Sequence, residues 1–334
     1  MRGMILSVVI PCYNMATYLD KCLSSLCDPC LEGRLEALIV NDGSTDESRS
    51  IALGYTARMP GLFRLIDKEN GGHGSAVNAG IDAARGKYLR IVDADDWVTG
   101  LPPLLDALED ADADLVIDQK FEVEKETGRE TFFALPESVP FGVTLPFSDW
   151  CGDTMTEYYM LHTMNVRLDF LKKLNVRLLE HTFYVDFEYV LKTTSRARTV
   201  RFVNLGVYHY LVGNREQSVA PVNYVKRADQ HRRVTEECLR FRQTADTQMR
   251  RYARRRCQLL VHTHLNILLI YDRDRSHGRR AARDFMRWLK AHDSEIWALV
   301  RRRYALALAL HCLGFTDETL AWLKRLTERK RARV

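Results

Sequence analysis

The first 120 residues alternate short apolar runs with segments whose apolar residues recur at helical spacing. The runs are nearly continuous and rich in β-branched residues, and they cover Ile5–Ile10, Leu35–Val40, Phe63–Ile66, Tyr88–Val92 and Leu115–Ile117. The helical segments between the first four runs are Thr17–Leu26, Thr45–Ala57 and Ser75–Ala84. Short buried strands that alternate with helices are typical of a mostly parallel sheet covered on both faces. We therefore expect an α/β fold in which ligands bind at the carboxyl ends of the strands.

The pattern changes after residue 120. Phe121–Val123 and Thr131–Phe133 flank a turn at Thr127-Gly128, which predicts a β-hairpin. Residues 150–220 mix strand and helix signals, and beyond Pro221 the chain is almost wholly helical in pattern and rich in arginine. We expect a domain boundary near Pro221, which separates residues 1–221 from a basic α-helical domain of residues 222–334.

The charges are distributed unevenly along the chain. With 46% hydrophobic and 10% aromatic residues the composition is globular, and the formal net charge is only +5. However, residues 226–334 carry 27 Lys and Arg against 12 Asp and Glu, whereas residues 1–225 carry 22 against 32. Nucleic acid is not an expected partner, because no recognisable binding module accompanies the arginines. An anionic membrane surface and an ordinary solvated helix face both stay open as explanations.

The hydropathy pattern also bears on location. The N-terminal apolar run Met4–Ile10 is too short for a secretory signal. The longest apolar stretches, Leu259–Tyr271 and Tyr304–Phe315, fall short of the roughly 20 residues that a spanning helix needs. We therefore expect a cytoplasmic protein, with peripheral contact at the inner face of the membrane if the basic part binds lipid.

Polar loops follow the first four predicted strands. They are Pro11–Asn14, Asn41–Asp46, Asn70–Gly74 and Asp93–Asp96. Because the carboxyl ends of parallel strands meet at one edge of the sheet, we expect these loops to form a single site.

Two loops carry residues suited to a metal and a nucleobase. Asp93 and Asp95 are spaced to share one face, and two close carboxylates favour a hard divalent cation that also binds phosphate. A solvated acidic turn is the alternative. Asp42 and the aromatic Tyr13 would suit a nucleobase, although Asp42 also fits a plain strand-to-helix turn with Ser44 or Thr45 as the helix cap.

The four loops together resemble glycosyltransferase family 2. The resemblance is carried by Ser7–Asn14, Val40–Asp46, Asn70-Gly71-Gly72 with Asn78, and Val92–Trp97. It implies a GT-A fold, which is Rossmann-like, and an inverting transfer of sugar from a nucleotide donor. Residues 1–120 would then be the donor half and residues 121–221 the acceptor half.

The resemblance also implies roles for single residues. The nucleotide-sugar site would include Pro11, Tyr13, Asp42, Asn70, Asp93 and Asp95. Asp95 would ligate Mg²⁺ or Mn²⁺ bound to the donor diphosphate, and Asp93 would face the ribose or reach the metal through water. The metal would offset charge on the leaving phosphate.

The catalytic base implied by the family is Asp186, in the segment Phe183–Tyr189. An Asp that caps the next helix is the alternative role. The chain departs from the family at Val185, where an acid is usual, and at Val77, where many relatives have an arginine. Expected substitutes for the acid are Glu188 or His181, and for the arginine Lys68, His73 or Arg215.

Two further segments are similar to family features. Tyr208–Leu211, followed by Arg215, Gln217 and Ser218, resembles the loop that closes over the donor. His162 occupies a position near the acceptor in relatives, and a buried core histidine is an equal alternative.

We therefore expect a metal-dependent inverting glycosyltransferase that uses a nucleotide sugar, most simply a UDP-sugar such as a UDP-hexose or UDP-N-acetylhexosamine. Its acceptor would be a glycan or a lipid-linked glycan in cell-envelope, capsular or exopolysaccharide biosynthesis. The alternatives are a non-catalytic nucleotide-sugar-binding or scaffold protein of the same fold, and a nucleotidyltransferase.

Overall fold

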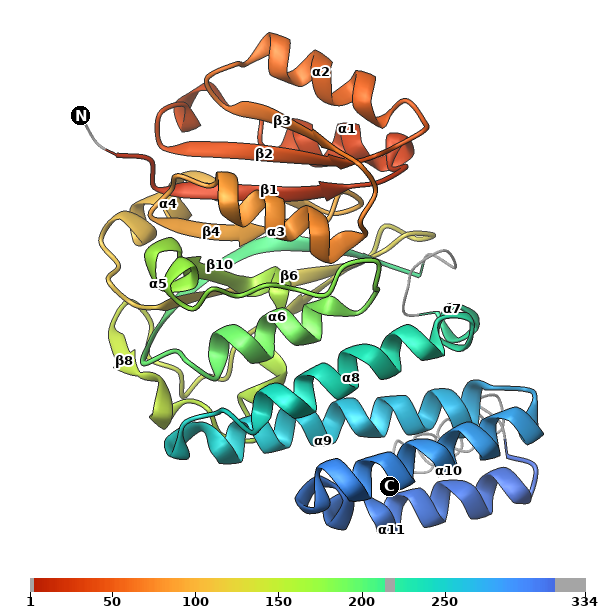
Figure 1. Ribbon diagram of the computed structural model, residues 1–334. Helices are drawn as coiled ribbons and strands as arrows, with labels where there is room; N and C mark the ends of the chain where they lie inside the picture. The colour runs from red at the N-terminus through yellow and green to blue at the C-terminus, as the bar shows by residue number, and fades with distance from the viewer. Residues whose placement is uncertain (1–2, 214–219, 316–334) are drawn as a thin grey trace, which may run out of the picture. The chain divides into compact units, whose positions relative to one another are not determined.

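The computed structural model describes residues 3–213 and 220–315 (Figure 1). Its contacts divide the chain into two compact units. The sheet unit comprises Met1–Asn214 with Ala245–Tyr252, and the helical unit comprises Arg215–Thr244 with Ala253–Val334. The expected domain boundary near Pro221 stays a prediction.

The sheet unit is built on one mixed sheet. Its strands follow the order β3-β2-β1-β4-β9-β6-β10-β5, with β7 paired to β6 and β8 to β10. Their bounds are β1 Leu6–Cys12, β2 Leu35–Asp42, β3 Phe63–Lys68, β4 Tyr88–Ile91, β5 Trp97–Val98, β6 Leu115–Glu124, β7 Glu130–Phe133, β8 Thr144–Pro146, β9 Met164–Arg167 and β10 Thr199–Val212. Strands β3, β2, β1 and β4 are parallel, and β9 runs antiparallel between β4 and β6. The predicted parallel half and the predicted hairpin, formed by β6 and β7, are confirmed.

Helices cover both faces of this sheet (Figure 1). They are α1 Ala16–Ser25, α2 Ser48–Arg58, α3 His73–Ala83, α4 Leu101–Glu109, α5 Leu168–Lys173 and α6 Val185–Thr194. One buried cluster joins side chains of α1, α2 and α4 to Val8 and Ile10 of β1. Gly80 of α3 instead packs on Val9, where a Cβ would lie 2.2 Å from a Val9 methyl. Because neighbouring side chains of a strand point to opposite faces, α3 lies on the other side of the sheet.

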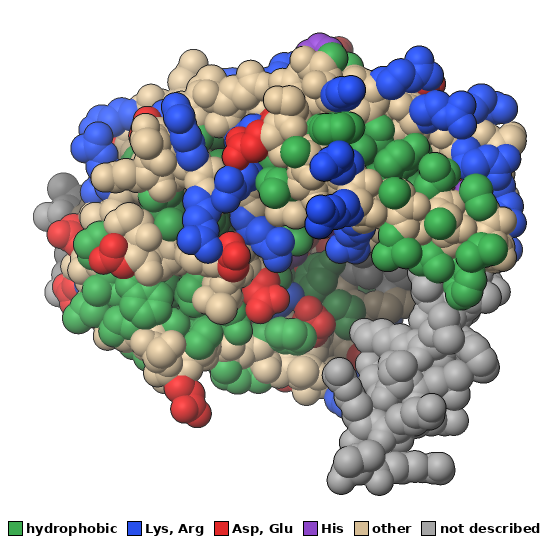
Figure 2. Space-filling model, turned by 90° about the horizontal axis from the view of Figure 1, so that it is seen from below, with side chains coloured by type: hydrophobic (Ala, Val, Ile, Leu, Met, Phe, Trp, Pro, Cys, Tyr) green, Lys and Arg blue, Asp and Glu red, His purple; other side chains and the backbone are tan. Residues whose placement is uncertain are grey.

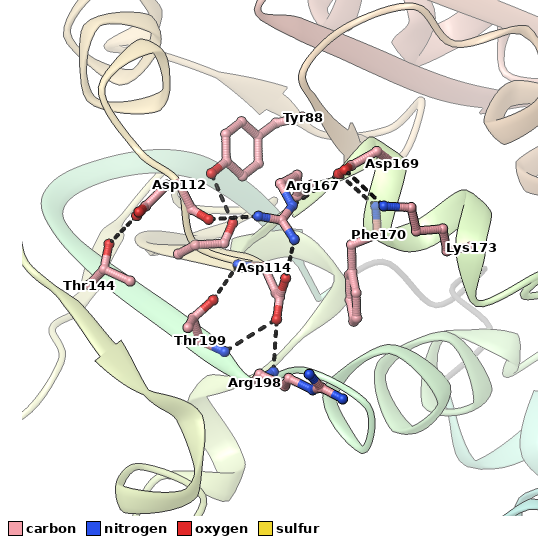
Figure 3. A network of polar contacts seen from close by, with 11 residues as sticks. Tyr88, Asp112, Asp114, Thr144, Arg167, Asp169, Phe170, Lys173, Arg198 and Thr199 are labelled. Carbon is pink, nitrogen blue, oxygen red and sulfur yellow. Dashed lines mark hydrogen bonds and ion pairs between the residues drawn. The ribbon is translucent and has the colours of Figure 1, made fainter.

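A polar network fixes the ends of three strands to one another (Figure 3). The Asp114 carboxylate accepts hydrogen bonds from the backbone N–H groups of Arg198 and Thr199 and from the Arg167 guanidinium. The backbone N–H of Asp114 donates to the Thr199 hydroxyl, and the Tyr88 hydroxyl donates to the Ala113 carbonyl in the same loop. The amino end of β6 is thereby tied to β9 and β10.

The helices of the helical unit are α7 Pro221–Lys226, α8 Ala228–Arg242, α9 Arg250–Asn266, the π-helical turn η6 Ile267–Tyr271, α10 Arg275–His292 and α11 Ser294–Cys312. The first residues of α9, up to Tyr252, are counted with the sheet unit. Asp274 caps α10 and Asp293 caps α11, each through its carboxylate. Among residues 3–213 and 220–315, none of the helices combines the length and apolar character that crossing a membrane requires.

Two local expectations were wrong. Helix α2 begins at Ser48, so neither Ser44 nor Thr45 caps it; the Ser44 hydroxyl instead accepts the backbone N–H of Asn14. Tyr208–Leu211 is not a loop but part of strand β10. Arg215, Gln217 and Ser218 lie outside the described residues.

Candidate active site

Asp42 holds the loop that follows β3. Its buried carboxylate accepts the backbone N–H groups of Gly71 at 3.0 Å and Gly72 at 2.8 Å and the ammonium of Lys68 at 2.7 Å. The Asn70 side chain donates to the Asp42 carbonyl at 2.9 Å. These contacts fix the orientation of the Asp42 carboxylate and of the loop that it holds.

Tyr13 and Pro11 flank the same position. In the β1–β2 pairing Pro11 lies opposite Val40 and Cys12 opposite Asn41, so the next residue, Tyr13, comes beside Asp42. Pro11 is buried, whereas Tyr13 is 47% exposed and offers an aromatic face. The prediction that Pro11, Tyr13 and Asp42 lie together is confirmed. Their roles toward a nucleotide stay predictions.

The segment before α6 rests directly on this loop. Asn78 exchanges two hydrogen bonds of 3.0 Å with the backbone of Leu178, and His181 donates its backbone N–H to the Gly71 carbonyl. A Cβ on Gly74 would lie 2.2 Å from the Leu179 carbonyl oxygen. Only glycine allows this approach, which joins the start of α3 to the segment that carries the predicted base.

Asp93 follows β4 and lies between two histidines. Nε2 of His73, at the start of α3, is 3.1 Å from one carboxylate oxygen, and Nε2 of His162, in the turn Leu161–Thr163, is 3.3 Å from the other. Burial alone would raise the pKa of Asp93, but the hydrogen bonds from His162 and His73 outweigh it and hold this pKa well below its usual range. Asp93 is therefore an anion fixed at both oxygens.

Asp95 and Asp96 have opposite surroundings. The Asp96 carboxylate is buried and accepts the Tyr208 hydroxyl and the backbone N–H of Leu211, so it ties this loop to β10. Within the described part of the chain, no side chain bonds to the Asp95 carboxylate. Burial and the charge of Asp93 raise the pKa of Asp95 to about 6. A cation would relieve that repulsion.

The donor set fits a divalent metal. Asp93, Asp96 and His162 offer ligand atoms that all lie within 4.8 Å of one another, with Asp95 in the same loop. Carboxylate oxygens are suitable ligands for Mg²⁺ and Mn²⁺, and an imidazole nitrogen binds Mn²⁺ more readily than Mg²⁺. His162 was not expected here as a metal ligand.

Asp186 is the second residue of α6 and does not cap it, because the cap position belongs to Tyr184. Tyr184 has a φ of 69° and His181 a φ of 52°, which is a left-handed backbone that side chains rarely adopt and that clusters at functional sites. Burial raises the pKa of Asp186, and the charges of His162 and His73 oppose that rise. Asp186 thus belongs to the same electrostatic cluster as Asp93.

The residues expected to replace the missing acid and arginine have different surroundings. Glu188 is fully buried, accepts the Leu179 N–H and pairs with Lys192 at 2.6 Å, so it does not replace the acid missing at Val185. His181 is exposed. Lys68 is engaged by Asp42 and His73 by Asp93, while Arg215 lies outside the described residues.

A buried ion pair supports the histidine side of the site. Arg90 of β4 pairs with Asp118 of β6, and both are inaccessible to solvent. The same guanidinium donates to the His162 carbonyl and to the Asn165 side chain. His162 also packs between the rings of Tyr208 and Tyr210, each 4.8 Å away. Sequence reasoning missed this support, although Arg90 inside one apolar run and Asp118 directly after another were visible signals.

Comparisons with known proteins bear on the family and the fold. Residues 7–168 match the profile of glycosyl transferase family 2. The chain is 44% identical over 92 residues to the putative glycosyltransferase EpsH of Bacillus subtilis, which is 28% of this chain and 26% of that protein. It is 33% identical over 216 residues to the uncharacterized glycosyltransferase YibD of Escherichia coli, which is 63% and 62% of the two chains. The chain thus spans from about a quarter to about three fifths of these relatives.

Solved structures show the fold. A crystal structure of S. aureus TarS 1-349 in complex with UDP-GlcNAc superposes with a TM-score of 0.66 at 19% identity, over 96% of this chain and 92% of that one. A mannosyltransferase from Pyrobaculum calidifontis in complex with GDP-Man and Mn²⁺ gives a TM-score of 0.54 at 15% identity, over 96% and 84%. The expected GT-A fold is confirmed, and the match of residues 7–168 to the family profile confirms the resemblance to glycosyl transferase family 2.

Proposed function

We propose that the chain is an inverting, metal-dependent glycosyltransferase that takes a UDP-sugar, most simply UDP-N-acetylglucosamine or a related hexose donor. Its acceptor is a glycan or a lipid-linked glycan of a cell-envelope, capsular or exopolysaccharide pathway. The observation that carries the proposal is the cluster in which Asp93, Asp95 and Asp186 share the neighbourhood of His73 and His162.

The relatives support the substrate class. TarS binds UDP-GlcNAc in its crystal structure, and the archaeal mannosyltransferase binds GDP-Man with Mn²⁺. A stretch of 94 residues is 34% identical to the minor teichoic acid biosynthesis protein GgaB of Bacillus subtilis. A uridine base would lie by Tyr13 and Asp42.

In the proposed reaction the acceptor hydroxyl oxygen bonds to the anomeric carbon while the bond from that carbon to the donor diphosphate breaks. Asp186 takes the hydroxyl proton, for which its raised pKa makes it a stronger base. The nucleoside diphosphate leaves with the bonding electrons. Asp95 with Asp93 would hold a Mg²⁺ or Mn²⁺, which would supply positive charge to stabilise this leaving group.

A non-catalytic scaffold is not favoured. Such a protein has no need for a buried acid with a raised pKa beside a fixed anion and two histidines. Release of UDP from a UDP-sugar separates the two possibilities, and release of pyrophosphate would indicate nucleotidyl transfer instead.

A thermal-shift screen of nucleotide sugars tests the proposal. Each donor is added with Mn²⁺, with Mg²⁺ or with EDTA, because a ligand that binds only the folded state raises the melting temperature. We expect the largest shift with a UDP-sugar and metal together, and its loss in Asp95→Ala. Binding of no nucleotide sugar under any of these conditions would contradict the proposal.

A further inference from the structure

The helical unit carries an apolar groove beside the π-helical turn η6. The groove has a volume of about 530 Å³ and is lined by Asn266, Ile270, Tyr271, Arg303, Leu306 and Leu310, among others. These residues come from α9, η6 and α11, all within one unit. A π-helical turn is uncommon and is often found at functional sites.

The groove continues into a leucine stripe on α11. Leu299 and Leu306 of α11 and Leu313, which directly follows the helix, are spaced seven residues apart, and they are 43%, 61% and 75% exposed. Residues seven apart lie on one face of a helix, so these side chains form a single row. A row of large apolar side chains left in water indicates a partner surface.

Positive charge without a carboxylate partner lies at the same place. Arg303 lines the groove, and no ion pair of the described residues involves Arg255, Arg302 or Arg303. By contrast, Arg242 and Arg254 of the same unit both pair with Glu295. Burial and the charges of Arg303 and Arg255 lower the pKa of His262, which places these three side chains close together. Nε2 of His262 is buried without a hydrogen-bond partner.

From this arrangement we propose that the α9–η6–α11 face docks on an anionic phospholipid membrane. The leucine stripe enters the acyl region, one lipid chain occupies the groove, and the arginines bind headgroup phosphates. Figure 2, which views the molecule from below, shows Lys and Arg side chains beside hydrophobic ones on the face seen there.

A second copy of the chain is a poorer occupant of this face. It would bring its own Arg302 and Arg303 to an interface that already holds unpaired arginines, and like charges repel. A purely acidic partner in solution would leave the leucine stripe exposed. An anionic bilayer satisfies the charge and the apolar row together. The proposal goes beyond the proposed function and does not depend on it.

Vesicle sedimentation of the full-length protein tests the proposal. Vesicles of phosphatidylcholine alone and with phosphatidylglycerol are compared at low and high salt. We expect binding to the anionic vesicles that weakens with salt. Arg303→Gln should weaken it roughly fivefold, the fold-change that corresponds to about 1 kcal/mol per arginine. Leu306→Glu should weaken it about tenfold or more, because an apolar contact is lost and a repelled charge is added.

Two matched variants control for general effects. Arg287→Gln removes an arginine that pairs with Asp284, and Leu53→Glu changes an exposed leucine of the sheet unit. Both should bind like the wild type. Binding that Leu306→Glu leaves intact, equal losses in the controls, or no binding at low salt would each overturn the proposal. An oligomer that Leu306→Glu dissociates, without vesicle binding, would assign the face to a second copy. Release of UDP from a donor in solution should be unchanged in every variant.

Discussion

Nε2 of His162 lies 3.3 Å from a carboxylate oxygen of Asp93, across 69 residues of sequence. With His73 on the other oxygen, Asp93 is held as a fixed anion and cannot swing away from its neighbour Asp95. Asp95 alone in this loop has a carboxylate that no described side chain engages. The loop therefore combines one immobile charge with one ligand that is ready for a cation.

The support beneath His162 is expected to be costly to break. Arg90→Met leaves Asp118 as a buried, unpaired charge, so we expect a loss of about 3–5 kcal/mol in the free energy of unfolding. The exposed pair of Arg49 and Asp67 is the control, and Arg49→Met should cost at most about 1 kcal/mol. Urea denaturation measures both.

A double variant separates stability from function at this pair. Arg90→Met with Asp118→Leu removes both charges and should recover most of the stability. It does not restore the hydrogen bond that Arg90 gives to the His162 carbonyl, so sugar transfer should stay impaired. Full activity in the double variant would show that Arg90 does not position His162.

The close approach of Gly74 to Leu179 is expected to matter for turnover. Gly74→Ala puts a Cβ 2.2 Å from the Leu179 carbonyl oxygen, so the segment before α6 must move. We expect a loss of about 1–3 kcal/mol in stability, typical of overpacking, and a fall in kcat. Gly54→Ala, in a helix with open space around it, should instead stabilise by about 0.5–1 kcal/mol. Unaltered stability and kcat in Gly74→Ala would contradict this contact.

Asp186→Asn tests the proposed base. The amide keeps the size of the side chain and cannot take the proton, so kcat should fall about 10²–10⁴-fold. The KM for the donor should change little, since the proton transfer lies on the acceptor side. Asp82→Asn, at an exposed position, is the control and should be fully active. Wild-type kcat in Asp186→Asn would remove Asp186 from the mechanism.

Acid is expected to destabilise the helical unit through two stacked histidines. His231 and His264 are buried with their rings 5.3 Å apart, and burial lowers the pKa of both, that of His231 to about 4. An unfolded histidine titrates near 6.5, so from about pH 6.5 down to 4 the unfolded chain binds more protons than the folded one. The contribution of these groups to stability is complete above about pH 6.5 and is lost as the pH falls.

His264→Leu isolates this effect. Relative to the wild type, its melting temperature should improve more at pH 5 than at pH 8, because one of the two groups that must protonate is gone. His292→Leu, at an exposed position, is the control. A parallel pH dependence in wild type and His264→Leu would contradict the account.

Much of the donor half could be predicted because it is local in sequence. Each of these strands contains a short, nearly continuous apolar run and is followed by its polar loop, so Tyr13, Asp42, Asn70 and Asp93 came to one edge as expected. Parallel pairing requires that convergence whatever the side chains are.

The remaining parts of the site depend on contacts between distant segments. His162 reaches Asp93 only because β9 inserts antiparallel between β4 and β6, and no periodicity in residues 150–220 indicated that insertion. From the sequence, Glu188 was a candidate to replace the missing acid. In the structure its carboxylate is buried and paired with Lys192, so its role is structural. Whether an acid is available depends on its neighbours in space, which sequence spacing does not give.

Metal-dependent sugar transfer is tested most directly by the release of UDP from a UDP-sugar by the purified protein, measured with Mn²⁺ and with EDTA. We expect release that requires the metal, increases when an acceptor is supplied, and is lost in Asp95→Ala but kept in Asp67→Ala, which changes an exposed aspartate. Release that continues unchanged in EDTA and in Asp95→Ala would contradict this expectation.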